Sequence, residues 1–178
     1  KMSFKGANLK GCFMAASNIE ECDFTNANLQ DGYMYDIDGA GAIFKGAKLQ
    51  NAKLNGANLE YCNFEESDLT NTDLSNANLI GADFTNSILV NVDLHNARLS
   101  KAKMINVNLE DATLVGLKIN HTDFEGANLK RANFTDSNLS NSKISNSNLS
   151  STIFDGAILR FADLHNTDLS DMSFNGTD

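Results

Sequence analysis

Side chains that commonly carry catalysis are few in this sequence and are spread along it. The three histidines are His95, His121 and His165. None has a serine, a threonine or another histidine at a spacing that would build a hydrolase triad or a metal site. Two acid pairs, the adjacent Glu65 and Glu66 and the pair Asp123 with Glu125, which could face one side, are interpreted as solvated charges. We therefore expect no enzyme, with no catalytic residue, no bound metal and no cofactor.

The charge balance limits the kinds of partner. The chain of 178 residues carries 23 acidic and 14 basic residues, a formal net charge of −9. Direct binding to nucleic acid through phosphates requires a basic surface, so it is not expected. An acidic surface instead suits a basic protein partner or mimicry of nucleic acid. No apolar run approaches the roughly 18 residues of a membrane span, so no membrane partner is expected either.

A five-residue period positions all of these side chains. From residue 4 to residue 174, every residue whose number ends in 4 or 9 is Leu, Phe, Met or Ile, except Gly39. The residue two places earlier is small, as at Ala27 and Ala77, and this spacing puts both side chains on one side of an extended backbone. The second residue after the large one is often Gly or Asn, which tolerate the positive φ that a type II turn needs. Each pentad is therefore predicted to be a three-residue strand followed by a corner.

Residues 20 apart are also alike. Leu recurs at every twentieth residue from Leu9 to Leu169, and Phe at every twentieth residue from Phe4 to Phe84. Four pentads per turn would stack such residues, so the sequence predicts a parallel, four-sided coil of 20 residues. The chain then forms a solenoid of about nine coils around a dry core, because a single pentad buries too little apolar surface to offset its ordering.

The three cysteines fit this pattern as core filler. They are Cys12, Cys22 and Cys62, and all lie at the small position two residues before a large apolar one. Their spacing matches no zinc or redox motif, and Cys22 and Cys62 would lie two coils apart, too far to form a disulfide. Buried free thiols favour a cytoplasmic location. Because the chain begins with Lys1, two alternatives stay open, a signal peptide that has been removed and a fragment of a longer chain.

In its short motifs the chain resembles the pentapeptide repeat family, whose consensus is A(D/N)LXX. The motif appears as ANL at 7–9, 27–29, 57–59, 77–79 and 127–129, as ADF at 82–84 and as ADL at 162–164. The resemblance covers essentially the whole chain and implies an all-β fold for residues 1–178, a right-handed quadrilateral parallel β-helix without enzymatic activity. Family members include cyanobacterial proteins, secreted bacterial effectors and DNA mimics that bind type II topoisomerases. A non-catalytic scaffold that binds another protein is thus the leading function, and a mimic of DNA that binds DNA gyrase or another DNA-handling enzyme is the alternative.

One group of outward-facing residues is predicted to bind the partner. Phe13 and Tyr33 lie 20 residues apart at outward positions, Tyr35 lies beside them, and Asp36 borders the group. Contiguous exposed aromatic residues often mark interfaces, which favours a protein contact here.

The core pattern fails once, next to this group. Ile37 is too large for its small position, and Gly39 replaces the expected large residue. We expect Ile37 to fill the space that Gly39 leaves, with the backbone bulged around it. Local repacking is therefore an alternative explanation of the neighbouring aromatic residues.

Charges are distributed unevenly over the four sides. The side that carries Met14 holds five aspartates, the candidate face of a DNA mimic: Asp36, Asp73, Asp93, Asp136 and Asp155. Asn and Ile at neighbouring positions leave this face less densely acidic than a mimic requires. The side that carries Ile19 is acidic early and basic late, where it holds Arg98, Lys101, Lys118 and Arg160. The open ends of a solenoid expose core and strand edges, so end-to-end association of two chains is a further expectation.

Overall fold

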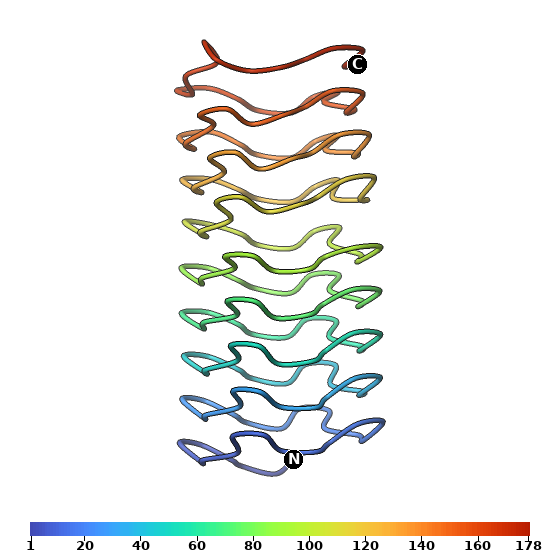
Figure 1. Ribbon diagram of the computed structural model, residues 1–178, viewed down its shortest axis with the longest axis vertical. Coiled ribbons are helices and arrows are strands. Elements are labelled where there is room, and N and C mark those ends of the chain that lie inside the picture. Colours follow the sequence, from blue (N-terminus) through green and yellow to red (C-terminus); the bar gives the residue numbers. More distant parts are fainter.

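The chain forms a straight rod of stacked four-sided coils (Figure 1). The computed structural model describes all 178 residues. It contains no helix, and so none that could cross a membrane, and each strand is so short that only one residue pairs with the neighbouring coil. The paired residues have numbers ending in 3 or 8, and every pair joins residues 20 apart in parallel, from Ser3 with Asp23 to Ile153 with Ser173. The prediction of a right-handed quadrilateral parallel β-helix with 20 residues per turn is confirmed.

Backbone hydrogen bonds tie each coil to its neighbours. Ile88 shows the pattern, because its N–H donates to the Ser67 carbonyl at 3.0 Å and its carbonyl accepts the Leu69 N–H at 2.8 Å. A third bond closes the corner, as from the Ser67 N–H to the Phe64 carbonyl at 3.1 Å. The bonds between coils run along the rod, so the coils before and after satisfy the backbone of each strand.

The corners adopt the turn that the sequence predicts. A positive φ occurs at the second residue after each large core position, from Gly6 to Gly176, except at Asp171. Most of these corners carry Gly, Asn or Asp, which accept this conformation most readily. Tyr61 and Phe161 adopt it as well, with φ of 57° and 59°, where a bulky side chain is strained. Neighbouring coils therefore hold the backbone in this geometry even where the residue disfavours it.

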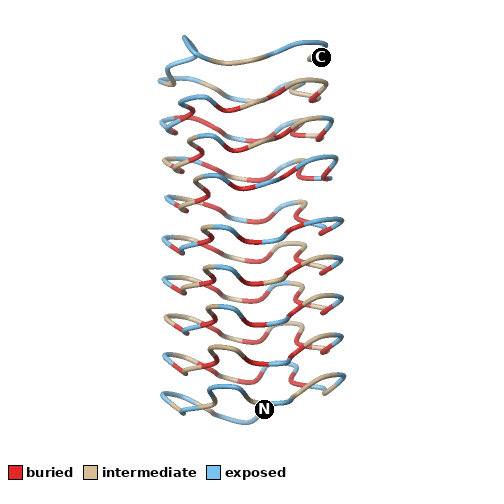
Figure 2. Cartoon of the chain, in the orientation of Figure 1, coloured by how far each residue is buried: buried red, intermediate tan, exposed pale blue.

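The interior is filled by the residues that the five-residue period selects. From Ile19 to Phe154, every large apolar side chain at these positions is at most 4% exposed. In one column, Phe rings stack along the axis from Phe4 to Phe84 with centroids 4.8–5.1 Å apart. Figure 2 shows the buried band running through the rod and fading in the first and last coils. Phe174 is accordingly 37% exposed, because only one coil packs against it.

From Ser67 to Thr152, serine and threonine at the small positions are buried and their hydroxyls donate hydrogen bonds to backbone carbonyls. Thr72 Oγ1 donates to the Leu49 carbonyl at 2.8 Å, and Thr122 Oγ1 donates to the Leu99 carbonyl at 2.9 Å. A buried hydroxyl without a partner would cost about 1–3 kcal/mol. These bonds therefore allow polar residues at the wall of the core.

The backbone passes the irregular segment without the bulge that the sequence suggested. Asp38 keeps its pairing with the residues 20 before and 20 after it, and the Gly39 N–H donates to the following coil at 2.8 Å. Ile37 is buried, as expected. A Cβ on Gly39 would lie 3.3 Å from Leu59 Cδ2 and 3.4 Å from Ile19 Cγ1. The expectation of a bulge is therefore wrong, because side chains of the adjacent coils already close the gap at Gly39.

Candidate functional site

The residues with catalytic potential lie apart on the surface. The three histidines are all exposed: His95, His121 and His165. Glu65 and Glu66 both contact Lys45, at 3.0 and 3.4 Å, so these adjacent acids form ion pairs at the surface, in keeping with their interpretation as solvated charges. No three His, Cys, Asp or Glu side chains lie close enough together to hold a metal ion.

The cysteines are free thiols in the wall, with one difference from the prediction. Cys22 and Cys62 are buried, whereas Cys12 is only half-buried because it lies in the first coil. The Cys62 S–H donates to the Gly39 carbonyl at 3.0 Å. Burial raises the pKa of Cys62 to about 12 and also raises the pKa of Cys12. Both thiols therefore stay protonated near neutral pH and are poor nucleophiles.

Three aromatic side chains lie together on the side that carries Met14. We call Phe13, Tyr33 and Tyr35 the aromatic cluster. The ring centroids of Phe13 and Tyr33 are 6.2 Å apart with 34° between the planes, and those of Phe13 and Tyr35 are 6.1 Å apart at 85°. Phe13 is 73% exposed and Tyr33 51%, while Tyr35 is half-buried. The rings of Phe13 and Tyr33 are thus side by side but tilted, which leaves apolar surface open to solvent.

Backbone register positions this cluster. Phe13 and Tyr33 are paired residues in adjacent coils, so their side chains leave the rod next to each other. Tyr35 follows at the corner and meets Phe13 edge to face. Asp36 occupies the next position with φ of 55° and is exposed. A Cβ on Gly56 would lie only 2.2 Å from Asp36 Oδ1, so the glycine leaves room for this carboxylate at the border of the cluster.

The five aspartates of the candidate mimic face share one side but not one environment. Asp73 and Asp93 are paired in adjacent coils. Asp73 and Asp155 are half-buried and accept hydrogen bonds from neighbouring Ser and Asn residues. Asp36 and Asp136 are exposed at corners. Asp93 is exposed and accepts a hydrogen bond from the His95 N–H at 2.9 Å. Apart from the paired Asp73 and Asp93, the side therefore presents separate carboxylates, and three of the five already accept hydrogen bonds within the fold.

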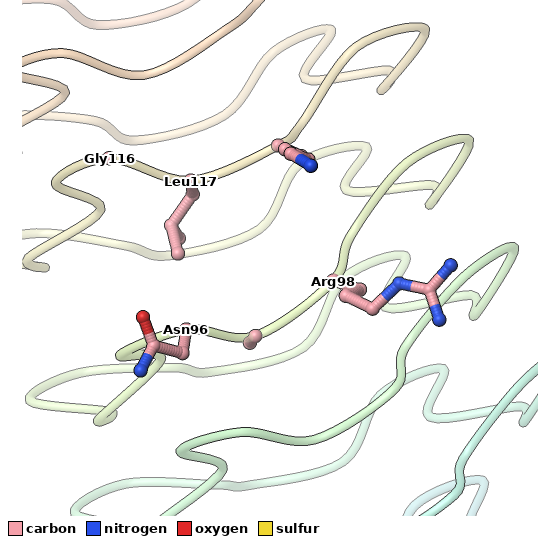
Figure 3. A pocket seen from close by; sticks show the side chains of 6 residues that line it. Asn96, Arg98, Gly116 and Leu117 are labelled. Atoms are coloured by element: carbon pink, nitrogen blue, oxygen red, sulfur yellow. The ribbon is translucent and has the colours of Figure 1, made fainter.

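The structure also contains a hollow that the five-residue pattern did not reveal. It has a volume of about 220 Å³ and lies between two adjacent coils, lined by residues 96–98 of one and 116–118 of the other. In Figure 3, the Leu117 side chain points into the gap and the Arg98 guanidinium extends outward at one end. Leu117 occupies a small position that takes Ala in the coil before, at Ala97. This size mismatch is the signal in the sequence that could have found the hollow.

Known family models match most of the chain. A model described as pentapeptide repeats (8 copies) matches residues 3–38, and a model described as a pentapeptide repeat region matches residues 40–114 and 87–160. No curated protein sequence matches the chain.

Solved structures share the fold. HetL, a pentapeptide repeat protein involved in heterocyst differentiation regulation from the cyanobacterium Nostoc sp. Strain PCC 7120, is 26% identical over 99% of this chain and 84% of HetL, with a TM-score of 0.59. QnrB1, a plasmid-mediated fluoroquinolone resistance protein, aligns with a TM-score of 0.85 over 99% of this chain and 90% of QnrB1. Its identity is 16%, so this likeness concerns the fold alone. Because these family models match residues 3–38 and 40–160, the chain belongs to the pentapeptide repeat family.

Proposed function

We propose that this protein is a non-catalytic scaffold that binds another protein through one side of its rod, with the aromatic cluster at the centre of the contact. The observation that carries this proposal is the exposure of Phe13 and Tyr33, whose rings lie beside each other, with Tyr35 against Phe13 on the same side of the rod. Aromatic residues are enriched among the residues that dominate binding energy at protein interfaces. Burying one such ring contributes on the order of 1.5–3 kcal/mol.

The surroundings of the cluster indicate the chemistry of the partner. Asp36 places an exposed carboxylate at its border, and the whole chain carries a net charge of −9. Complementary charge across an interface steers association and fixes orientation. The expected partner surface is therefore an apolar pocket with a Lys or Arg beside it. Flat sides of a continuous rod, with the histidines far apart, suit this role better than catalysis.

A matched pair of multiple variants tests the proposal. The cluster variant is F13S/Y33S/Y35S, and the control is Y61S/F161S, because Tyr61 and Phe161 are 68% and 87% exposed and do not belong to the cluster. The wild type and both variants serve as bait in extract of the source cell, and each protein retained by the wild type is purified and titrated against all three by calorimetry. We expect the cluster variant to lose binding and the control to keep it, with thermal unfolding midpoints near that of the wild type for both. Equal binding of the purified partner to the cluster variant would contradict the assignment of this site.

The alternative, a mimic of nucleic acid that binds a type II topoisomerase such as DNA gyrase, has one observation in its favour. Asp73 and Asp93 lie in paired positions of adjacent coils, on the side that also carries Asp36. The remaining carboxylates of this side are separate, which makes the mimic the weaker candidate. Inhibition of supercoiling by purified gyrase, relieved in D73N/D93N, would support the mimic. Lack of inhibition at micromolar protein would remove it.

A further inference from the structure

Basic residues gather on one side of an otherwise acidic rod. We call Arg98, Lys101, Lys118 and His121 the basic cluster, and all four are exposed. Arg98 and Lys118 are paired residues in adjacent coils, and Lys101 and His121 are 20 residues apart at the next corner. This cluster lies on the side that carries Ile19, away from the aromatic cluster.

The cations of the basic cluster have no acidic partner. Arg98, Lys101 and Lys118 form no ion pair, whereas most other Lys and Arg residues do, as Lys103 does with Asp83 at 3.0 Å. Like charges at directly opposed positions of neighbouring strands repel each other. The Arg98–Lys118 pair therefore costs stability that a bound anion would offset.

The hollow beside the basic cluster exposes backbone groups that pair in other coils. In the coil before, the Arg98 N–H donates to the Ala77 carbonyl at 3.0 Å. The equivalent bond from the Lys118 N–H to the Ala97 carbonyl is absent, and these two groups belong to opposite walls of the hollow. Leu117 points into this gap and is larger than the Ala found at the same position one coil earlier (Figure 3).

We propose that the hollow and the basic cluster together bind a phosphate group. Arg98 and Lys118 supply two positive charges at the edge of the hollow. In its walls, the backbone N–H groups of Asn96 and Lys118 are donors without a partner. A phosphate brings a charge near −2 and at least three acceptor oxygens, which match two cations and two N–H donors better than a single carboxylate does. The unpaired Ala97 carbonyl accepts the remaining proton of hydrogenphosphate. The hollow has a volume of about 220 Å³, several times the roughly 30 Å³ that one water molecule occupies in the liquid. It therefore leaves room for the anion and some of its water.

Titration of the ¹⁵N-labelled protein with inorganic phosphate at low ionic strength tests the proposal. We expect saturable shifts of the amide signals of Asn96 and Lys118, with a dissociation constant of about 1 mM or below. The variant R98Q/K118Q should bind at least about tenfold more weakly. The control K48Q/K53Q removes the same charge at two other exposed lysines without ion pairs and should bind like the wild type.

Each outcome decides for or against the site. No saturation up to about 10 mM phosphate in the wild type would overturn the proposal, whether or not R98Q/K118Q folds. Equal weakening in K48Q/K53Q would overturn it too, because the response would then reflect only the net charge. A parallel titration with O-phosphoserine, with serine as its control, identifies the source of the phosphate. Tighter binding than inorganic phosphate indicates a phosphorylated side chain, and weaker binding indicates the free ion.

Discussion

Phe64 lies flat against Phe84 of the next coil, with ring centroids 4.9 Å apart and 4° between the planes. Phe64 makes the same contact with Phe44 on its other side, at 4.9 Å and 5°. Each of the three middle rings of this column, Phe24, Phe44 and Phe64, therefore packs against rings in two coils, 20 residues before and 20 after it in the sequence. Such contacts make the stability of the rod a property of stacked coils, because an isolated pentad has nothing to pack against.

Replacing one ring of this column should be costly. Phe64→Ala removes a fully buried side chain and leaves a cavity between two rings, so we expect the free energy of unfolding to fall by about 3–5 kcal/mol. The control Ile88→Ala changes a side chain that is 41% exposed and should cost under about 1 kcal/mol. Urea unfolding followed by circular dichroism measures both. A loss below about 1 kcal/mol for Phe64→Ala would show that the coils do not depend on this column.

The buried thiol of Cys62 should make stability fall at high pH. Burial raises its pKa to about 12 in the folded protein, against an ordinary value of 9.0. Between these values the unfolded chain has lost the proton that the folded protein keeps, so the stability present below pH 9.0 is lost as the pH rises toward 12.

Comparison with Cys62→Ala isolates this effect, because Ala is common at the small position and does not titrate. We expect the free energy of unfolding to decrease more for the wild type than for Cys62→Ala between about pH 8 and pH 10.5. Cys12→Ala keeps the buried Cys62 thiol and removes only a half-buried one, so its stability should depend on pH much as that of the wild type does. Identical pH dependence in the wild type and Cys62→Ala would contradict the burial of this thiol.

The core could be predicted from sequence because the backbone fixes the direction of each side chain. The residues whose numbers end in 4 or 9 face inward, and a turn of 20 residues then places Leu109 directly against Leu89 in the next coil. The same register places Phe13 beside Tyr33, so the position of the aromatic cluster was predictable. Its tilted ring geometry was not, because ring angles depend on side-chain packing rather than on register. Its role in binding a partner stays a prediction.

Features that depend on side-chain volume escaped the pattern. The segment around Gly39 keeps its register because side chains from adjacent coils fill the gap, a balance of volumes that a five-residue period does not encode. The hollow at Leu117 lies where the imbalance is the opposite, a side chain large for its position. Charge could be sorted by side from the sequence, but only the structure places the unpaired Lys118 N–H beside the basic cluster.

A hydrogen-bonded carboxylate joins the final two coils. Asp155 Oδ1 accepts a hydrogen bond from the Ser173 hydroxyl at 2.5 Å and another from the Asn175 backbone N–H at 2.9 Å. These bonds lower the pKa of Asp155 below its ordinary 3.8. The lowered pKa stabilises the fold above pH 3.8, and this contribution is lost as the pH falls below it. Ser173→Ala should raise the pKa of Asp155 toward 3.8, as measured by NMR of the carboxyl carbon. Asp168, whose pKa is lowered by Ser170, is the internal control and should not change.

Strain at one corner should be relieved by exchanging two residues. Phe161 and Asn141 occupy the same corner in adjacent coils, with φ of 59° and 61°. This conformation costs most L-residues roughly 1–2 kcal/mol and Asn less, and the Phe161 ring is 87% exposed, so it gains little from burial. Phe161→Asn should therefore raise the free energy of unfolding by up to about 1 kcal/mol, and Asn141→Phe should lower it by a similar amount. Urea unfolding of both variants and of the exchanged double variant, which has the wild-type composition, measures the strain. Destabilisation by Phe161→Asn would mean that contacts of the ring outweigh the strain at the corner.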